Sequence, residues 1–367
     1  MNNNIEDFEE LEELEANAEG YSCPSCGAPI KFDPKTSTLE CSYCGFRHEF
    51  NGKETDVEFD LDEDARSEDN SWNNETKTVK CEGCGSLNVV DLDGMTSTCP
   101  FCGSHKVIDT EELSGIKPHR VIPFKLTDEE AKNLYINFVK KKFFTPRKVK
   151  KSKIDVLVCG VYLPMWTFDT KTFSSYTGRL GKHYTKVVGS GKNRRTVTKT
   201  RWYRISGNIN VNFDDLLVNA GKQITQKEIE SIAPFSTNES FEYDKKFLAG
   251  FSAEHYQVPL RKGWDIARAL SNPIIERNIL KRYVYDVKGE VIIHPNYYDN
   301  KFKYVLVPVW IGNYTYKGKK YRFIVNGETG KLSGKAPIST LKVTLTVFFI
   351  ILIIGIIIFL VYNSGNL

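Results

Sequence analysis

An apolar stretch close to the end of the chain constrains the fold more than any other feature. Val343 to Tyr362 reads VTLTVFFIILIIGIIIFLVY, twenty residues without a charge. As an α-helix it would be about 30 Å long, which matches the hydrocarbon core of a bilayer. Helices of soluble proteins usually keep a polar face, and this stretch has none. The sequence therefore predicts a transmembrane helix over 343–362, with the rest of the chain as a body attached to it.

The charges around this stretch predict its orientation. Lys331, Lys335 and Lys342 precede it, and the NSGNL that follows carries no charged side chain. Positive flanks stay in the cytoplasm. Met1 to Gly20 has eight acidic residues, no basic residue and no apolar run, so no signal peptide is expected there. We predict a single-pass, tail-anchored protein of the cell membrane whose N-terminal body lies in the cytoplasm.

Eight of the nine cysteines fall into two copies of one pattern, Cys-x2-Cys-x14-Cys-x2-Cys, offset by 58 residues. This spacing is close to that of four-cysteine zinc sites. Free thiolates require a reducing compartment, which agrees with a cytoplasmic body. The predicted ligands are Cys23, Cys26, Cys41 and Cys44 in the first copy and Cys81, Cys84, Cys99 and Cys102 in the second.

The residues around each cysteine pair fit a metal site. A glycine follows every pair, as expected where the turn needs a positive φ and directs backbone N–H groups at sulfur. Two such turns joined by a hairpin close a tetrahedral site, so we expect two structural zinc ions without an open coordination position. Iron in a rubredoxin-like site is the alternative. His48 and His105 follow the last cysteines and are interpreted as surface residues, because four ligands are already present.

Composition divides the chain into segments with opposite charge. Residues 1–104 carry 24 acidic and 7 basic residues, and the remainder carries 22 acidic and 43 basic ones. The acidic segment between the two cysteine copies is predicted to be a flexible linker that lets the metal modules move independently. The predicted segments are an acidic tail (1–20), zinc ribbon 1 (21–50), the linker (51–78), zinc ribbon 2 (79–108), a basic domain (115–335) and the transmembrane helix (343–362).

The basic domain is predicted to be rich in β-strands, with helices inserted between them. Thr127 to Glu130 form a capping box that begins a helix. The KKKFFTPRKVKKSK segment after that helix either contacts phosphates or is a solvated helix end. Strand signals dominate from Ile154 onward, and Asn326-Gly327 marks a tight hairpin turn. Further helices are expected at 226–232 and 263–283.

Two segments of this domain resemble each other. Tyr162-Leu163-Pro164-Met165-Trp166 is echoed by Leu306-Val307-Pro308-Val309-Trp310, so we expect two related β units. The predicted fold class is α+β and β-rich: two small four-cysteine zinc ribbons, a mainly antiparallel β domain with inserted helices, and one C-terminal transmembrane helix.

No catalytic motif is found. GSGKNRR at 189–195 fails as a phosphate-binding loop, because Lys186 stands where the pattern needs glycine and Asn193 where it needs serine or threonine. The sequence has neither G-x-S-x-G nor H-E-x-x-H. Cys159 lies in an apolar run and is expected to be a buried, inert thiol. A non-enzymatic protein is predicted, with a basic hairpin formed by Lys192, Arg194, Arg195, Lys199, Arg201 and Arg204.

The paired ribbons, the two Pro-x-Trp strands, the YKGKKYRFIVNGETGKLSGKAP segment and the terminal anchor resemble a bacterial family. Its members are called TFIIB-type zinc-ribbon-containing proteins and are sometimes labelled as primosomal helicases, although helicase motifs are absent here. The resemblance implies a membrane-anchored, non-enzymatic protein. It also implies association with flotillin-like and phage-shock-type membrane-stress proteins.

The favoured hypothesis is a membrane-tethered adaptor that holds its zinc ribbons at the cytoplasmic membrane surface to bind protein partners. Basic residues before the anchor would contact anionic lipid headgroups, each contributing up to about 1 kcal/mol. The alternative is nucleic-acid binding at the membrane, which the net charge of the ribbon half disfavours. The predicted lipid contacts are Lys317, Lys319, Lys320, Arg322, Lys331, Lys335 and Lys342.

Overall fold

The computed structural model describes residues 22–50, 57–62, 76–91, 99–109, 115–151 and 157–364. The predicted acidic tail and most of the predicted linker lie outside these residues. Within them the fold is α+β and β-rich, as predicted, with two four-cysteine modules, a mostly antiparallel sheet with helices, and one C-terminal apolar helix.

The strands and helices vary widely in length. Most strands have two to eight residues, whereas three strands of the body have 25 to 32 residues. The strands are β1 (Lys31–Asp33), β2 (Thr38–Glu40), β3 (Arg47–Glu49), β4 (Phe59–Asp60), β5 (Thr76–Cys81), β6 (Leu87–Asp91), β7 (Val107–Asp109), β8 (Arg120–Val121), β9 (Leu157–Val188), β10 (Arg195–Asn219), β11 (Phe241–Glu242), β12 (Ser252–Glu254), β13 (Val287–Tyr316), β14 (Lys319–Asn326) and β15 (Leu332–Gly334). The α-helices are α1 (Asp128–Lys141), α2 (Arg147–Lys151), α3 (Gln226–Ile232), α4 (Leu260–Leu280) and α5 (Thr340–Ser364), and short 3-10 turns cover Gly191–Asn193, Thr237–Glu239 and Lys245–Leu248.

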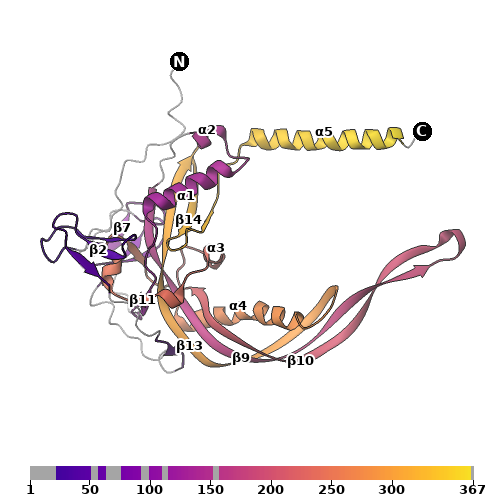
Figure 1. Ribbon diagram of the computed structural model, residues 1–367, viewed down its shortest axis with the longest axis horizontal. Coiled ribbons are helices and arrows are strands. Elements are labelled where there is room, and N and C mark those ends of the chain that lie inside the picture. The colour runs from indigo at the N-terminus through magenta and orange to yellow at the C-terminus, as the bar shows by residue number, and fades with distance from the viewer. Residues whose placement is uncertain are drawn as a thin grey trace, which may run out of the picture.

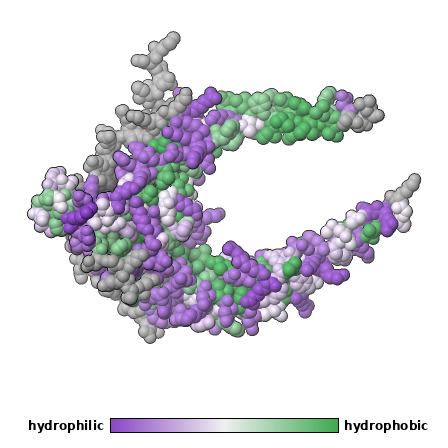
Figure 2. Space-filling model, viewed as in Figure 1, coloured by the Kyte–Doolittle hydropathy of each residue, from purple (hydrophilic) through white to green (hydrophobic). Residues whose placement is uncertain are grey.

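Strands β9 and β13 form the centre of the large sheet. They pair antiparallel along almost their whole length, while β10 lies on the other side of β9 and β14 on the other side of β13. The three long strands curve together, and the β9–β10 hairpin extends beyond the body toward the same side as α5 (Figure 1). The hairpin surface is largely hydrophilic, whereas α5 is apolar along most of its length (Figure 2).

The two segments with similar sequences lie side by side at this centre. Leu163 pairs with Val307, and Pro164 pairs with Leu306, so the two copies of the motif pair with each other in antiparallel register. Each strand also receives a short parallel strand: β12 pairs with β9, and β8 pairs with β13. A helix follows each short strand, α4 after β12 and α1 after β8.

The two halves repeat the same hydrogen bonds around this centre. Ala220 N–H donates to the Pro164 carbonyl at 3.0 Å, and Gly327 N–H donates to the Pro308 carbonyl at 2.9 Å. The Ala220 carbonyl then accepts from two consecutive N–H groups just before α4, and the Gly327 carbonyl accepts from two just before α1. These repeated contacts relate the two halves by an approximate two-fold axis.

The tryptophans of the two motifs complete the repeat. Trp166 Nε1 donates to the Val258 carbonyl at 2.8 Å, and Trp310 Nε1 donates to the Leu126 carbonyl at 3.0 Å. Both acceptors belong to the residue just before a helix N-cap. Each indole is buried, so its N–H needs a protein partner. The tryptophans therefore fix where α4 and α1 begin on the sheet.

Several local predictions are confirmed and one is modified. The capping box at Thr127 begins α1, and α3 has the predicted bounds. The turn after Asn326 joins β14 to β15 over five residues, with the positive φ at Gly330. This loop is longer than the tight turn predicted at Asn326-Gly327, because the Asn326 side chain accepts from the N–H groups of Glu328 and Thr329 and stabilises the longer loop.

Candidate metal centres and the root of the apolar helix

The four cysteines of ribbon 1 converge on one point. Cys23 Sγ lies 3.5 Å from Cys44 Sγ, and Cys26 Sγ lies 3.6 Å from Cys41 Sγ. All four sulfurs lie within 4.8 Å of one another. The hairpin formed by β1 and β2 joins the two Cys-x2-Cys turns and brings them together.

The four cysteines of ribbon 2 converge in the same way. Cys81 Sγ lies 3.7 Å from Cys102 Sγ, and Cys84 Sγ lies 3.6 Å from Cys99 Sγ. Four sulfurs around a metal with bonds of about 2.3 Å form a tetrahedron with edges of about 3.8 Å. Disulfide sulfurs would lie about 2.05 Å apart. The separations in both groups therefore fit a four-thiolate metal site and exclude disulfides.

The backbone of each turn supports this assignment. The glycines after the four cysteine pairs have φ between 72° and 76°, as the sequence predicted. In every turn the glycine N–H donates to the carbonyl of the first cysteine. In ribbon 1, N–H groups of Cys44 and Tyr43 hydrogen-bond the Cys41 thiol and lower its pKa to about 7. The backbone N–H groups of this turn thus favour the thiolate of Cys41, the form that binds a metal.

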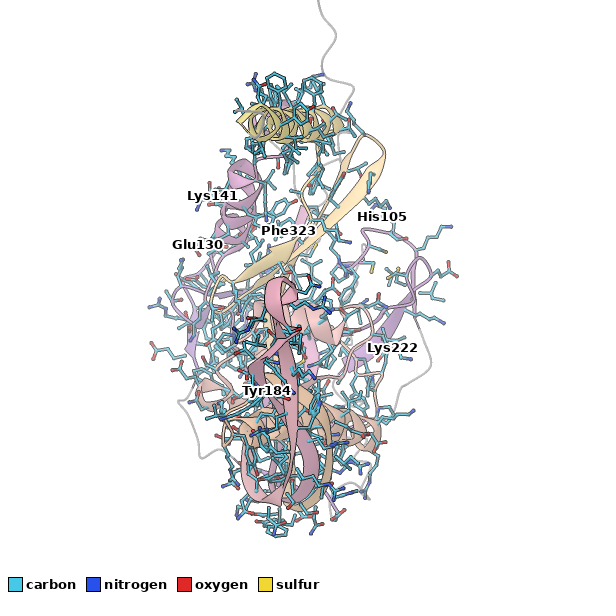
Figure 3. The ribbon with its side chains drawn as sticks, turned by 90° about the vertical axis from the view of Figure 1, so that its right-hand side faces the viewer. His105, Glu130, Lys141, Tyr184, Lys222 and Phe323 are labelled. Carbon is cyan, nitrogen blue, oxygen red and sulfur yellow. The ribbon has the colours of Figure 1, made fainter. Side chains whose placement is uncertain are left out.

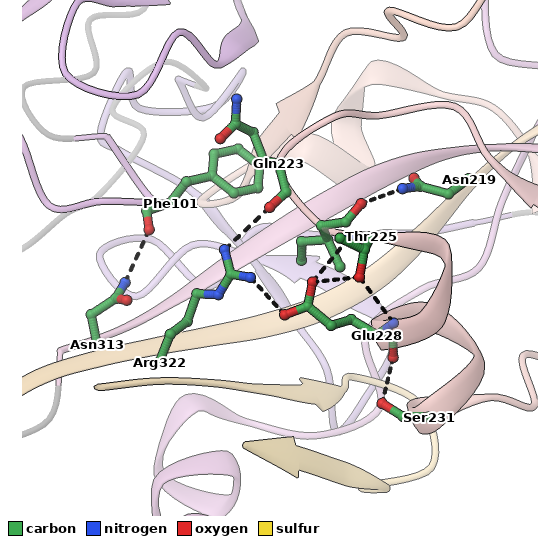
Figure 4. Close-up of polar contacts among 9 residues, drawn as sticks. Phe101, Asn219, Gln223, Thr225, Glu228, Ser231, Asn313 and Arg322 are labelled. Carbon is green, nitrogen blue, oxygen red and sulfur yellow. Dashed lines mark hydrogen bonds and ion pairs between the residues drawn. The ribbon is translucent and has the colours of Figure 1, made fainter. Parts of the chain in front are cut away.

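Ribbon 2 is part of the large sheet. Its strand β6 pairs with β12, where Val89 lies opposite Ala253 and Asn88 lies opposite Glu254. Two side chains of the body also reach its metal-binding turns. Gln223 Nε2 donates to the Cys84 carbonyl. Asn313 Nδ2 donates to the Phe101 carbonyl at 3.4 Å (Figure 4). The metal centre of ribbon 2 is therefore built into the body.

A buried serine adds a contact in ribbon 2 that ribbon 1 lacks. Ser86 Oγ lies 3.3 Å from Cys99 Sγ and 3.4 Å from Cys84 Sγ, and it accepts from Asn88 Nδ2. At the corresponding position of ribbon 1, 58 residues earlier, stands Ala28. The single O–H of Ser86 can donate to one thiolate, such as that of Cys99, from outside the ligand set.

Ribbon 1 packs on the body through aromatic rings. Phe50 stacks on Phe247 with ring centroids 3.9 Å apart, and Phe32 contacts both Phe247 and Phe251. One backbone bond joins the two parts, from Phe32 N–H to the Ala249 carbonyl. Both ribbons thus contact the body in the structure, which differs from the prediction of independent modules. One described piece of the predicted linker, residues 57–62, also packs on the body, since β4 pairs with β13.

The outer face of ribbon 1 stays open to solvent. Cys26 and Cys44 are exposed at the surface, whereas Cys84 and Cys102 of ribbon 2 are only partly exposed. Tyr43, between the last two ligands of ribbon 1, has 77% of its surface exposed. The two metal centres therefore differ in their surroundings, one enclosed by the body and one at the surface.

The remaining sequence candidates lie away from both metal centres. His48 packs edge-on against Phe50 and lies near Lys246 of the body, so it is partly buried where ribbon 1 meets the body. His105 is exposed. Cys159 is buried, and burial raises the pKa of its thiol to about 11, as expected of an inert thiol.

Helix α5 is the one helix among the described residues that is long and apolar enough to cross a membrane, over Thr340–Asn363. It makes no buried contact with the body along its apolar window. Its first turn is tied to the loop between α1 and α2. The Ser339 N–H donates to the Phe144 carbonyl, and Lys342 Nζ donates to the Phe143 and Thr145 carbonyls.

The predicted lipid-contacting residues occupy different environments. Lys317, Lys319, Lys320 and Lys335 are exposed near the root of α5. Lys331 Nζ donates to the Ala233 carbonyl. Arg322 is already engaged by the body, because its guanidinium pairs with Glu228 at 2.6 Å and donates to the Gln223 carbonyl (Figure 4). Burial alone would raise the pKa of Glu228, but hydrogen bonds from Thr225 and Arg322 lower it.

The structure adds residues from the end of α1 to this region. Phe143 is exposed and Phe144 partly so, and Lys142 lies over the Phe138 ring at 4.6 Å. In the sequence, these residues belong to the KKKFFTPRKVKKSK segment, which is compatible both with phosphate contact and with a solvated helix end. Its position beside α5 depends on contacts almost two hundred residues apart in the chain.

A buried carboxyl group lies beside ribbon 2. Glu254 Oε1 accepts from the N–H groups of Lys222 and Gln223 at 3.1 and 3.3 Å. Burial raises the pKa of Glu254 from 4.5 to about 7, against the effect of these two N–H groups. Its ionised form is therefore destabilised in the folded protein.

Replacing Glu254 with glutamine is expected to stabilise the protein at pH 8 but not at pH 4. The folded carboxyl keeps its proton to a higher pH than the unfolded one, so its contribution is lost as pH rises from about 4.5 to about 7. Glutamine keeps the acceptor without the charge, so we expect a gain of at most about 3 kcal/mol at pH 8. Thermal unfolding of both proteins at the two pH values measures this. The same change in melting temperature at both pH values would contradict it.

Comparison with known proteins gives one relative. The chain is 29% identical over 329 residues to "Uncharacterized protein YdjG" of Bacillus subtilis (strain 168), covering 88% of this chain and 91% of that protein. The matched length exceeds the body alone, so the similarity extends beyond residues 115–335. No family model matches the chain. No solved structure matches it either.

Proposed function

We propose that the protein is a non-enzymatic, membrane-tethered adaptor that presents ribbon 1 to a protein partner at the cytoplasmic face of the cell membrane. The observation that carries this proposal is the contrast between the two metal centres. Ribbon 2 is built into the sheet, whereas ribbon 1 rests on the body and exposes Tyr43 and two metal ligands. Two zinc ions in these sites would stabilise the fold of the ribbons.

The physical chemistry of ribbon 1 suits protein recognition. Tyrosine is enriched at interface hot spots, because it offers a large apolar ring and a polar tip with little conformational entropy to lose. A metal-closed turn holds the Tyr43 backbone rigid, which reduces the entropic cost of binding. The family resemblance favours flotillin-like or phage-shock-type proteins as partners.

Helix α5 supports the tether. An exposed apolar helix of this length is unfavourable in water, and a bilayer removes its surface from water. The lysines around its root suit the anionic cytoplasmic leaflet. With α5 in the membrane, the body and its ribbons would remain within reach of partners at the membrane surface.

The β9–β10 hairpin favours a second function, nucleic-acid binding. Basic residues cover this hairpin, and Tyr184 and Trp202 are exposed on it, with Arg201 over the Tyr184 ring at 5.4 Å. Basic grooves with exposed rings are typical of single-strand binding surfaces.

Affinity purification of the full-length protein from its own membranes distinguishes the two functions. An adaptor is expected to retain its protein partner after nuclease treatment and in 0.5 M salt. Loss of the co-purifying proteins after nuclease treatment would instead support nucleic-acid binding and overturn the adaptor function. Co-purification of nucleic acid without any protein would do the same.

A further inference from the structure

A pocket of about 880 Å³ lies at the root of α5. It is bounded by the end of α1 and the loop after it, by β14, and by the segment that leads from β15 to α5. Figure 3 looks toward this side of the molecule, with Lys141 and Phe323 labelled below α5. The volume is within the range of small-molecule binding sites, about 300 to 1,000 Å³.

The lining of the pocket is amphipathic. Its cationic residues are Arg322 and four lysines, Lys142, Lys319, Lys320 and Lys335, and its apolar ones include Phe138, Phe143, Phe144 and Ile338. The one carboxylate in the lining, Glu228, is already paired with Arg322. The other two charged residues of the lining, Arg322 and Glu228, form an ion pair with each other. The four lysine ammonium groups therefore give the pocket a net positive charge.

These lysines are available to a ligand. Within the part of the chain that the structure describes, no carboxylate lies within ion-pair distance of Lys319, Lys320 or Lys335. Lys319 lies 6.0 Å from the centre of the Tyr321 ring, as Lys142 lies over Phe138. The rings hold ammonium groups at the rim without neutralising them.

The position of the pocket specifies the ligand. Ile338 lines the pocket and precedes the start of α5 at Thr340. Hydrogen bonds from Ser339 and Lys342 fix the Phe143–Thr145 wall to the first turn of that helix. With α5 in a bilayer, this wall would lie at the depth of the lipid headgroups.

We propose that the pocket binds one anionic glycerophospholipid. The phosphate would contact Lys319, Lys320 and the neighbouring lysines, and the first acyl carbons would lie along Phe143, Phe144 and Ile338. A zwitterionic choline lipid would bring a cation to the lysines and is disfavoured. This inference rests on the membrane placement of α5 in the proposed function. It goes beyond surface attraction, because it requires a single saturable site.

Native mass spectrometry of the full-length protein in a neutral detergent tests the proposal, with dioctanoyl phosphatidylglycerol as the probe. The wild type is expected to saturate at one bound lipid. The pair Lys319→Gln/Lys320→Gln is expected to bind about 30-fold more weakly. Lys140→Gln/Lys141→Gln is the matched control, because these lysines are exposed at the end of α1 and do not line the pocket.

Each outcome decides between the site and its alternatives. Equal weakening in both variants would show that the lipid binds to diffuse surface charge, and it would overturn the proposal. Binding of a choline lipid to the wild type as strongly as phosphatidylglycerol would also overturn it. Displacement of the lipid by millimolar inorganic phosphate would show a free-anion site and overturn it too. Ser333→Phe, which narrows the pocket without changing charge, should also weaken binding. Partner capture from membranes is measured separately, so failure of the lipid site and failure of the adaptor function are distinguishable.

Discussion

Replacing Cys81 with serine is expected to destabilise the whole body of the protein. Cys81 is fully buried, and it ends a strand of ribbon 2 that belongs to the large sheet through β6 and β12. Structural zinc supplies about 10 to 16 kcal/mol of apparent folding free energy in isolated modules. Loss of even a third of this would lower the melting temperature by roughly 10 °C. Thermal unfolding in detergent and metal analysis measure the effect, and the metal content should fall from two ions to one.

Cys26→Ser is the matched control for this prediction. It removes the same kind of ligand from ribbon 1, which rests on the body through Phe32 and Phe50 and shares no strand pairing with it among the described residues. We expect the metal content to fall by one ion while the main unfolding transition of the body shifts by only about 2 °C. Equal shifts for the two variants would contradict the view that ribbon 2 alone is built into the body.

Replacing Trp166 with alanine is expected to cost about 3 to 5 kcal/mol of unfolding free energy. The indole is fully buried, and α4 approaches it so closely that a Cβ at Gly263 would lie 2.7 Å from its ring. The substitution leaves a cavity under α4 and removes the donor to the Val258 carbonyl. Chemical denaturation of the purified protein, followed by circular dichroism, measures the loss.

Trp202→Ala controls for the loss of a tryptophan as such. This residue is 44% exposed on the β9–β10 hairpin, so its replacement should cost less than about 1 kcal/mol. Trp310→Ala, at the equivalent place in the other half, should resemble Trp166→Ala. A large difference between the two buried sites would argue against the approximate two-fold relation.

Features that depend on local spacing could be predicted from the sequence. The ligand sets follow from two short turns and a hairpin, the capping box from four residues, and the apolar helix from twenty. In each case the determining residues are neighbours in the chain, and the chemistry of thiolates, N-caps or hydrocarbon allows few alternatives.

Features that depend on distant contacts could not be predicted. The pairing of Asn88 with Glu254 joins segments more than 160 residues apart, and no local pattern encodes it. Arg322 had the charge and sequence position of a lipid contact, but α3 brings Glu228 against it. The pocket at the root of α5 is lined by both Phe144 and Lys320, which are separated by a similar number of residues in the sequence. Such packing is determined by the whole fold.

The most direct test of the adaptor function is capture of the protein partner by a Tyr43→Ser variant. The full-length variant and the wild type are purified by affinity from their own membranes, and the co-purifying proteins are compared at equal metal content. We expect at least a tenfold loss of the partner, because a central interface tyrosine contributes more than 1 kcal/mol. Tyr184→Ser, at an exposed tyrosine of the hairpin, should retain it. Undiminished capture by Tyr43→Ser would contradict the role assigned to ribbon 1.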